Sequence, residues 1–133
     1  MKSIFLDTGI FELFFSGNQT IKKIFNQIKN ETIKAFTLEL NLCENFYKTC
    51  EKLGKETAQI RNISLRNSKI KILEINDQLT IRSGIFKCKY PQLLSLVDAY
   101  ISGCADLNKL VIYSTDPGLK DIKEVKNNIF PLD

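Results

Sequence analysis

The chain has 133 residues, with 19 basic and 15 acidic side chains and a formal net charge of +4. This length allows one domain of ordinary size, so we expect a single domain over residues 1–133. Hydrophobic residues make up 44% of the chain, enough for a core, but no apolar run reaches the roughly 20 residues of a membrane span. The basic surplus suits a polyanionic partner such as RNA without requiring one.

The sequence contains no histidine. This excludes Ser-His and Cys-His nucleophile pairs, histidine acid–base catalysis and histidine-containing metal sites. Hydrolysis near neutral pH would have to use carboxylates, lysines, tyrosines or a metal ion. Mg²⁺ and Mn²⁺ prefer the oxygen ligands that carboxylates supply.

Two features of the sequence bear on its compartment. The four cysteines form no Cys-x-x-Cys pair, and we interpret them as apolar packing residues in a reducing cytosol. The short apolar stretch at the N-terminus ends at Asp7, too early for a signal peptide. We therefore expect a cytoplasmic protein without a membrane partner.

Predicted strands and helices alternate along the chain. The first strand, at residues 3–6, precedes a dense apolar helix at 8–15 and an amphipathic helix at 20–28. The further elements are a strand at 32–36, a helix at 38–53 capped by Thr37 and followed by Gly54, a charged helix at 55–67, a strand at 69–75, a helix at 77–88, a break at Tyr90-Pro91, a helix at 93–108, a strand at 110–113, a turn and short helix from Asp116 and an edge strand at 128–132.

Strands separated by helices predict a parallel sheet that is covered on both faces. We therefore expect an α/β protein, a three-layer α/β/α sandwich with a central parallel sheet of four to five strands. The strands at 3–6 and 110–113 are the most continuously apolar, so they should be central. In such sheets, ligands bind at the carboxyl ends of the strands, near the point where the strand order reverses.

Four carboxylates stand out against this fold. Asp7 follows the first strand directly and Asp116 follows the fourth by three residues, although each could instead cap a helix. Glu44 and Asp98 lie inside predicted helices at the edge of apolar stripes, where a carboxylate is costly unless it reaches water, a partner or a metal ion. Crowded carboxylates repel one another, and a divalent cation reverses that repulsion. The residues alone thus predict an acidic cleft suited to a metal ion.

Four short strings resemble the PIN domain family. They are Phe5-Leu6-Asp7-Thr8, Asn41-Leu42-Cys43-Glu44-Asn45-Phe46-Tyr47, Ser95-Leu96-Val97-Asp98-Ala99-Tyr100 and Ser114-Thr115-Asp116-Pro117. The resemblance spans residues 3–132 and is greatest to the small single-domain members that serve as VapC-type toxins in prokaryotic toxin–antitoxin pairs. The chain departs from the family at Leu119, where an aromatic residue is common, and this touches packing more than chemistry.

The resemblance implies an endoribonuclease that depends on Mg²⁺ or Mn²⁺ and leaves a 5′-phosphate. Asp7 and Asp98 would be direct metal ligands, while Glu44 and Asp116 would hold the metal or its waters. Small toxins of this family usually form homodimers and are inhibited by a small antitoxin protein that blocks the cleft.

Two positions match hydroxyl groups of the family. Thr8 matches the hydroxyl after the first aspartate, and either Ser114 or Thr115 matches the one before the last. Basic residues that could bind phosphates form an equally good solvated helix face, so none is singled out as an RNA contact; they are Arg61, Arg66, Lys69, Lys71 and Arg82.

Other readings of the sequence remain open. The chain could be a non-catalytic PIN-like RNA-binding or assembly module on the same fold. Two other phosphotransfer classes do not fit. A phosphoacceptor phosphatase would need Asp-x-Asp after the first strand, where this chain has Asp7-Thr8-Gly9, and a receiver domain would need adjacent acids there. The apolar segment 10–15 is either core or part of a dimer or antitoxin surface.

Overall fold

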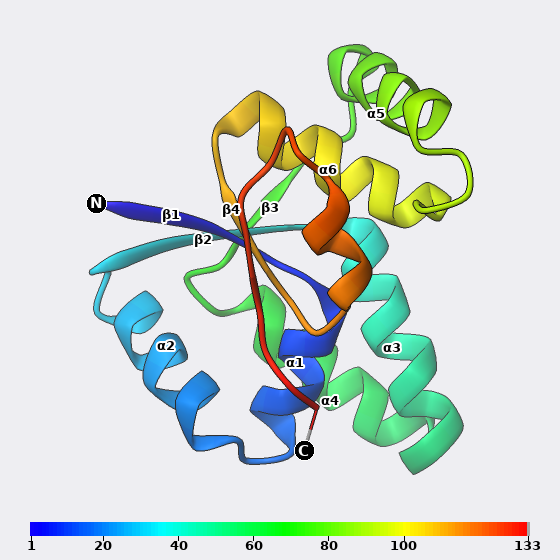
Figure 1. The fold of residues 1–133 in the computed structure, drawn as a ribbon. Coiled ribbons are helices and arrows are strands. Elements are labelled where there is room, and N and C mark those ends of the chain that lie inside the picture. Colours follow the sequence, from blue (N-terminus) through cyan, green and yellow to red (C-terminus); the bar gives the residue numbers. More distant parts are fainter. Residues whose placement is uncertain (133) are drawn as a thin grey trace.

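A parallel five-stranded sheet forms the centre of the computed structural model, which describes residues 1–132 (Figure 1). The strands lie in the order β3-β2-β1-β4-β5, and every pairing between them is parallel. Their bounds are β1 (Lys2–Leu6), β2 (Ile33–Leu38), β3 (Lys71–Leu73), β4 (Val111–Ser114) and β5 (Asn127–Ile129). The prediction that the first and fourth strands are central is confirmed, and the two strands are neighbours.

Six α-helices and one short 3₁₀ helix connect the strands. They are α1 (Thr8–Phe15), α2 (Gln19–Lys29), α3 (Glu39–Leu53), α4 (Lys55–Arg66), α5 (Asp77–Lys89), α6 (Leu96–Asn108) and η1 (Pro117–Asp121). The predicted apolar helix at 8–15 coincides with α1. The helix predicted at 93–108 begins later, at Leu96, because the Ser95 side chain accepts a hydrogen bond from the Asp98 backbone N–H and caps the helix there.

The sheet is buried between two apolar layers. Successive side chains of a strand point to opposite faces, so Phe5 enters one layer while Ile4 and Leu6 enter the other. In Figure 1, α5 and α6 lie above the sheet and α1, α2 and α4 lie below it. Ile10 and Phe11 are fully buried in the lower layer, which confirms core packing for that part of α1. The three-layer α/β/α architecture is therefore confirmed.

Two local predictions are wrong. Thr37 does not cap α3: it lies in β2, one residue before the strand ends at Leu38, and its hydroxyl donates to the Leu6 carbonyl at 2.9 Å, which ties the ends of β1 and β2 together. The cysteines are not all packing residues, because Cys104 is buried but Cys43 and Cys88 are exposed. Within residues 1–132, no helix combines the length and apolar character needed to cross a membrane.

Candidate active site

Asp7 lies at the carboxyl end of the central strand, where the chain passes directly into α1. Its backbone N–H donates to the Tyr113 carbonyl of β4 at 3.0 Å, which aligns the ends of β1 and β4. Its side chain caps α1 by accepting from the Thr8 backbone N–H at 2.7 Å. Asp7 is only 8% exposed. Asp7 thus both follows the central strand directly, as predicted, and caps α1.

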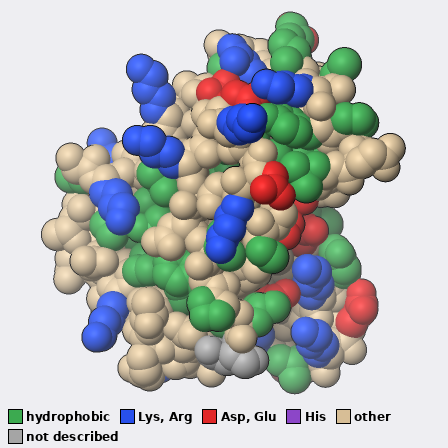
Figure 2. Space-filling model, in the orientation of Figure 1, with side chains coloured by type: hydrophobic (Ala, Val, Ile, Leu, Met, Phe, Trp, Pro, Cys, Tyr) green, Lys and Arg blue, Asp and Glu red, His purple; other side chains and the backbone are tan. Residues whose placement is uncertain are grey.

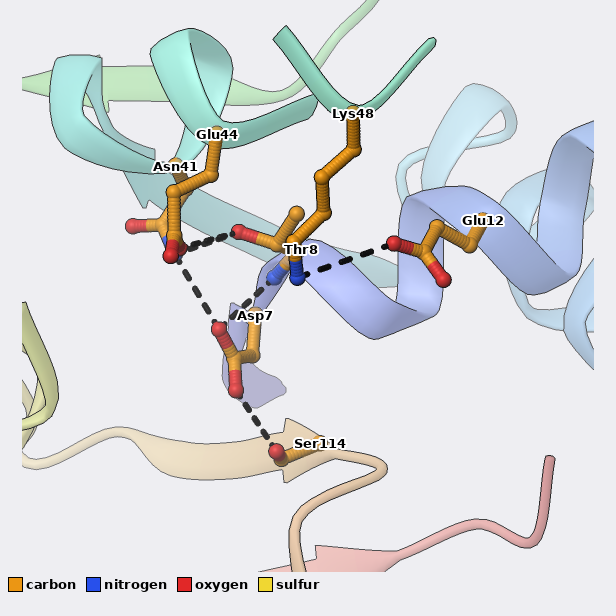
Figure 3. Close-up of polar contacts among 7 residues, drawn as sticks. All are labelled: Asp7, Thr8, Glu12, Asn41, Glu44, Lys48 and Ser114. Atoms are coloured by element: carbon orange, nitrogen blue, oxygen red, sulfur yellow. Dashed lines mark hydrogen bonds and ion pairs between the residues drawn. The ribbon is translucent and has the colours of Figure 1, made fainter. Parts of the chain in front are cut away.

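Both carboxylate oxygens of Asp7 accept side-chain hydrogen bonds (Figure 3). The Ser114 hydroxyl donates to Oδ2 at 2.6 Å, and the Asn41 amide donates to Oδ1 at 3.1 Å. Burial raises the pKa of Asp7 to about 6; the hydrogen bonds from Ser114 and Thr8 oppose this rise, and the charges of Asp98 and Glu44 add to it. Asp7 is therefore a buried carboxylate that titrates just below neutral pH.

Glu44 is joined to Asp7 through Thr8 and Asn41. The Thr8 hydroxyl donates to Glu44 Oε1 at 2.8 Å, and the Asn41 amide nitrogen also lies 3.2 Å from the Thr8 hydroxyl oxygen. Asn41 is completely buried on α3, three residues before Glu44. No role for Asn41 was predicted from the sequence. Its position three residues before Glu44 nevertheless places the two side chains on the same face of the helix.

Asp98 lies in the first turn of α6 rather than inside the helix, because α6 begins at Leu96. The prediction that Asp98 lies inside its helix is therefore wrong: the Asp98 N–H donates to the Ser95 cap, and in this first turn the helix dipole favours an acid. Burial raises the pKa of Asp98, and the charges of Asp116 and Glu44 raise it further, while hydrogen bonds from Ser95 lower it.

Asp116 is exposed and caps η1, with Oδ1 accepting from the Gly118 N–H at 2.9 Å. Its own backbone N–H donates to the Ser114 hydroxyl oxygen at 3.0 Å, so one serine contacts both Asp7 and Asp116. Thr115 instead turns toward α1, where a Cβ added to Gly9 would collide with its hydroxyl. Of the two hydroxyls considered from the sequence, Ser114 is the one that reaches Asp7.

The predicted carboxylates influence one another electrostatically. Asp98 and Glu44 both raise the pKa of Asp7, and Asp116 and Glu44 both raise the pKa of Asp98. The structure thus brings the four acids, from β1, α3, α6 and the loop after β4, to one end of the sheet. This end is the carboxyl edge where β1 meets β4 and where the order of connections reverses, the position expected for a ligand site.

A family model described as the PIN domain matches residues 4–125. The chain belongs to the PIN domain family. No curated protein sequence matches it. The resemblance carried by the four short strings is therefore confirmed at the level of the family.

Solved structures with this PIN fold include bacterial toxin–antitoxin proteins. A chain of DNA-bound VapBC from Salmonella typhimurium has a TM-score of 0.79 and 18% identity, with 97% of this chain and 98% of that chain covered. A chain of a toxin–antitoxin complex from Klebsiella pneumoniae has a TM-score of 0.71 and 18% identity over 97% and 99%. Mycobacterium tuberculosis VapC20, described as a Sarcin-Ricin loop cleaving toxin, has a TM-score of 0.74 and 15% identity over 90% and 95%. At these identities the likeness establishes the fold.

The carboxylates of this PIN domain have the right donor atoms for a hard cation, but their side chains do not point toward a common site. All of them offer oxygen donors, and the mutual repulsion that raises the pKa of Asp7 and Asp98 is what a divalent cation would relieve. Within residues 1–132, however, no three acidic or thiol side chains converge closely enough to hold a metal ion. Asp7 and Glu44 point instead at Ser114 and Thr8. Coordination would require these side chains to turn toward a common point.

Proposed function

We propose that this PIN domain is a metal-dependent endoribonuclease and the toxin of a toxin–antitoxin pair. One observation carries the proposal: Asp7, Glu44, Asp98 and Asp116 come from four separate segments to one edge of the sheet. Repelling carboxylates seldom gather in a fold unless they serve a function. The structurally similar VapC20 is described as a Sarcin-Ricin loop cleaving toxin, which supports RNA as the substrate class.

In this proposal Asp7 and Asp98 bind Mg²⁺ or Mn²⁺ directly, and Glu44 and Asp116 hold the metal or its waters. Such an ion would polarise the phosphate, ionise a bound water and stabilise the negative charge on the leaving oxygen. The donor chemistry fits, since carboxylate oxygens are the preferred ligands of both cations.

The protein's own contribution is the placement and charge of these carboxylates. Ser114 and Asn41 hold the two oxygens of Asp7 in fixed directions, and Thr8 does the same for one oxygen of Glu44. Because the pKa of Asp7 is raised only to about 6, its carboxylate is mostly ionised at pH 7. In the reaction, water adds to phosphorus, the bond from phosphorus to the 3′-oxygen breaks, and the 5′-phosphate stays on the downstream fragment.

The partners follow from the same proposal. We expect a cytoplasmic homodimer and a small antitoxin protein that covers the acidic cleft, since one structurally similar chain comes from a toxin–antitoxin complex. A non-catalytic RNA-binding or assembly module on the same fold is the competing function. It predicts neither cleavage of RNA nor a thermal shift on addition of manganese.

A cleavage assay with purified protein separates the two functions. A 3′-labelled RNA is incubated with Mg²⁺ or Mn²⁺ and, in parallel, with excess chelator. The nuclease proposal predicts cleavage only with the cation, and downstream fragments that carry a 5′-phosphate and are accepted by a ligase. Equal cleavage in excess chelator, or no cleavage of a broad set of structured and single-stranded RNAs, would contradict it.

A further inference from the structure

A groove of about 450 Å³ lies between α1, α3 and α4, next to the acidic edge of the sheet. Three basic residues line it, Lys48 and Lys52 from α3 and Arg61 from α4, against one acid, Glu12. Leu13 and Leu53 contribute apolar surface to the same groove. The lining therefore carries a surplus of positive charge directly next to a cluster of negative charge.

The groove adjoins the acidic edge through α3, which contributes residues to both. Glu44, Lys48 and Lys52 are spaced four residues apart on α3, so they follow one another along one side of the helix at steps of about 6 Å. Thr8 and Glu12 are spaced in the same way on α1. Figure 3 shows Lys48 beside Glu44, with its ammonium group directed toward Glu12. In Figure 2, acidic and basic side chains adjoin on the side of the molecule where α3 and α4 run.

These cations are available to a ligand. Lys48 lies 3.8 Å from Glu12, and with both side chains partly exposed this ion pair stabilises the fold little. In the part of the chain that the structure describes, neither Lys52 nor Arg61 forms an ion pair. The Arg61 guanidinium lies 4.8 Å from the centre of the Phe15 ring, and this cation–π contact leaves its N–H donors available to an anion.

We propose that this basic groove binds the phosphates of the RNA strand that leave the cleft next to the cleaved bond. The inference rests on the proposed function, because it takes RNA as the molecule cleaved at the carboxylates. A strand that emerges from four carboxylates needs cations to hold its flanking phosphates. The spacing of Lys48 and Lys52 is comparable to that of neighbouring phosphates on an extended strand, and the leucines offer contact to a ribose or base.

Binding is measured without cleavage, by fluorescence anisotropy of a labelled 12-nucleotide RNA in chelator. The test variant is Lys48→Gln/Lys52→Gln/Arg61→Gln. The control is Lys22→Gln/Lys23→Gln/Lys29→Gln, which removes the same charge from exposed positions of α2 outside the groove. We expect the test variant to bind about tenfold more weakly and to lower the slope of log affinity against log salt by about 2, since each phosphate contact on a single strand contributes about 0.7. The control should change both values much less.

A second variant should change the RNA affinity in the opposite direction. Glu12→Gln removes the one acid of the lining and should tighten RNA binding, whereas a merely structural role for the groove predicts no gain. In the presence of Mn²⁺, the test variant should raise KM for the 12-nucleotide RNA and leave kcat within about threefold. It should raise KM for a trinucleotide much less, because that substrate cannot reach Lys52.

Failure of this inference is distinct from failure of the proposed function. Unchanged RNA affinity and salt slope in the test variant would overturn the groove assignment even if cleavage were confirmed. The same holds if the variant loses only its affinity for a glutamate-rich peptide, because the groove would then serve an acidic protein partner. The wild type could also cleave no RNA while the test variant binds RNA more weakly than the wild type does. In that case the groove binds RNA phosphates and the nuclease proposal falls.

Discussion

The hydroxyl of Ser114 donates a hydrogen bond of 2.6 Å to Oδ2 of Asp7, although 107 residues separate them in the chain. The contact exists because β1 and β4 are neighbouring parallel strands whose carboxyl ends meet at one edge. Ser114 stabilises the ionised carboxylate while burial destabilises it, and the pKa of Asp7 rises to about 6. Changing either the burial or the hydrogen bond should therefore shift the pH at which Asp7 ionises.

Removing the Ser114 hydroxyl should shift the pH dependence of cleavage. In Ser114→Ala the pKa of Asp7 rises further, because the hydrogen bond that lowers it is lost. We expect kcat/KM near pH 6 to fall by about tenfold, as for loss of one hydrogen bond to a charged group, with a smaller loss near pH 8. The measurement is the pH–rate profile in Mn²⁺. Ser102→Ala is the matched control, since Ser102 is fully buried and its hydroxyl has no hydrogen-bond partner in the described chain. An unshifted profile in Ser114→Ala would refute the role of this contact.

Asn41 should act on the same carboxylate from the other side. Asn41→Ala removes the amide that donates to Asp7 Oδ1 and lies within hydrogen-bond distance of Thr8, so we expect kcat to fall about tenfold. Asn45 is the control: it lies one turn further along α3, is 2% exposed, and its amide nitrogen has no partner in the described chain. Asn45→Ala should lower the melting temperature comparably and leave kcat nearly unchanged. Equal losses of kcat in both variants would assign Asn41 to packing alone.

The sheet and its acidic edge were predictable because their signals are local. An apolar run that ends at Asp7 and another that ends before Asp116 already place two acids at the carboxyl ends of strands. The hydrogen bonds that hold these acids were not predictable, since Ser114 to Asp7 and Asn41 to Thr8 depend on which strands and helices become neighbours. The apolar stripe extends back to Leu93 and so predicts too early a start for α6, whereas the Ser95 side chain caps the helix and fixes its start at Leu96.

Asp7 should also make the stability of the metal-free protein depend on pH. Burial raises the pKa of Asp7 from its usual 3.8 to about 6, so between these values the folded chain holds a proton that the unfolded chain has released. The free energy of unfolding therefore falls as pH rises through this window, by at most about 3 kcal/mol. Asp7→Asn should be more stable than the wild type at pH 7 and not at pH 4, as measured by urea denaturation in chelator. An advantage of the variant that is the same at both pH values would contradict this origin.

Cleavage of RNA by two aspartate variants tests the central claim most directly. Asp7→Asn keeps the shape of the buried side chain and removes the charge at the acidic edge, while Asp121→Asn makes the same change at an exposed position of η1. Both are compared with the wild type on one labelled RNA in Mn²⁺, with melting curves to show that each is folded. The account predicts that Asp7→Asn loses cleavage by at least about a thousandfold and that Asp121→Asn retains it. Undiminished cleavage by a folded Asp7→Asn variant would contradict the account.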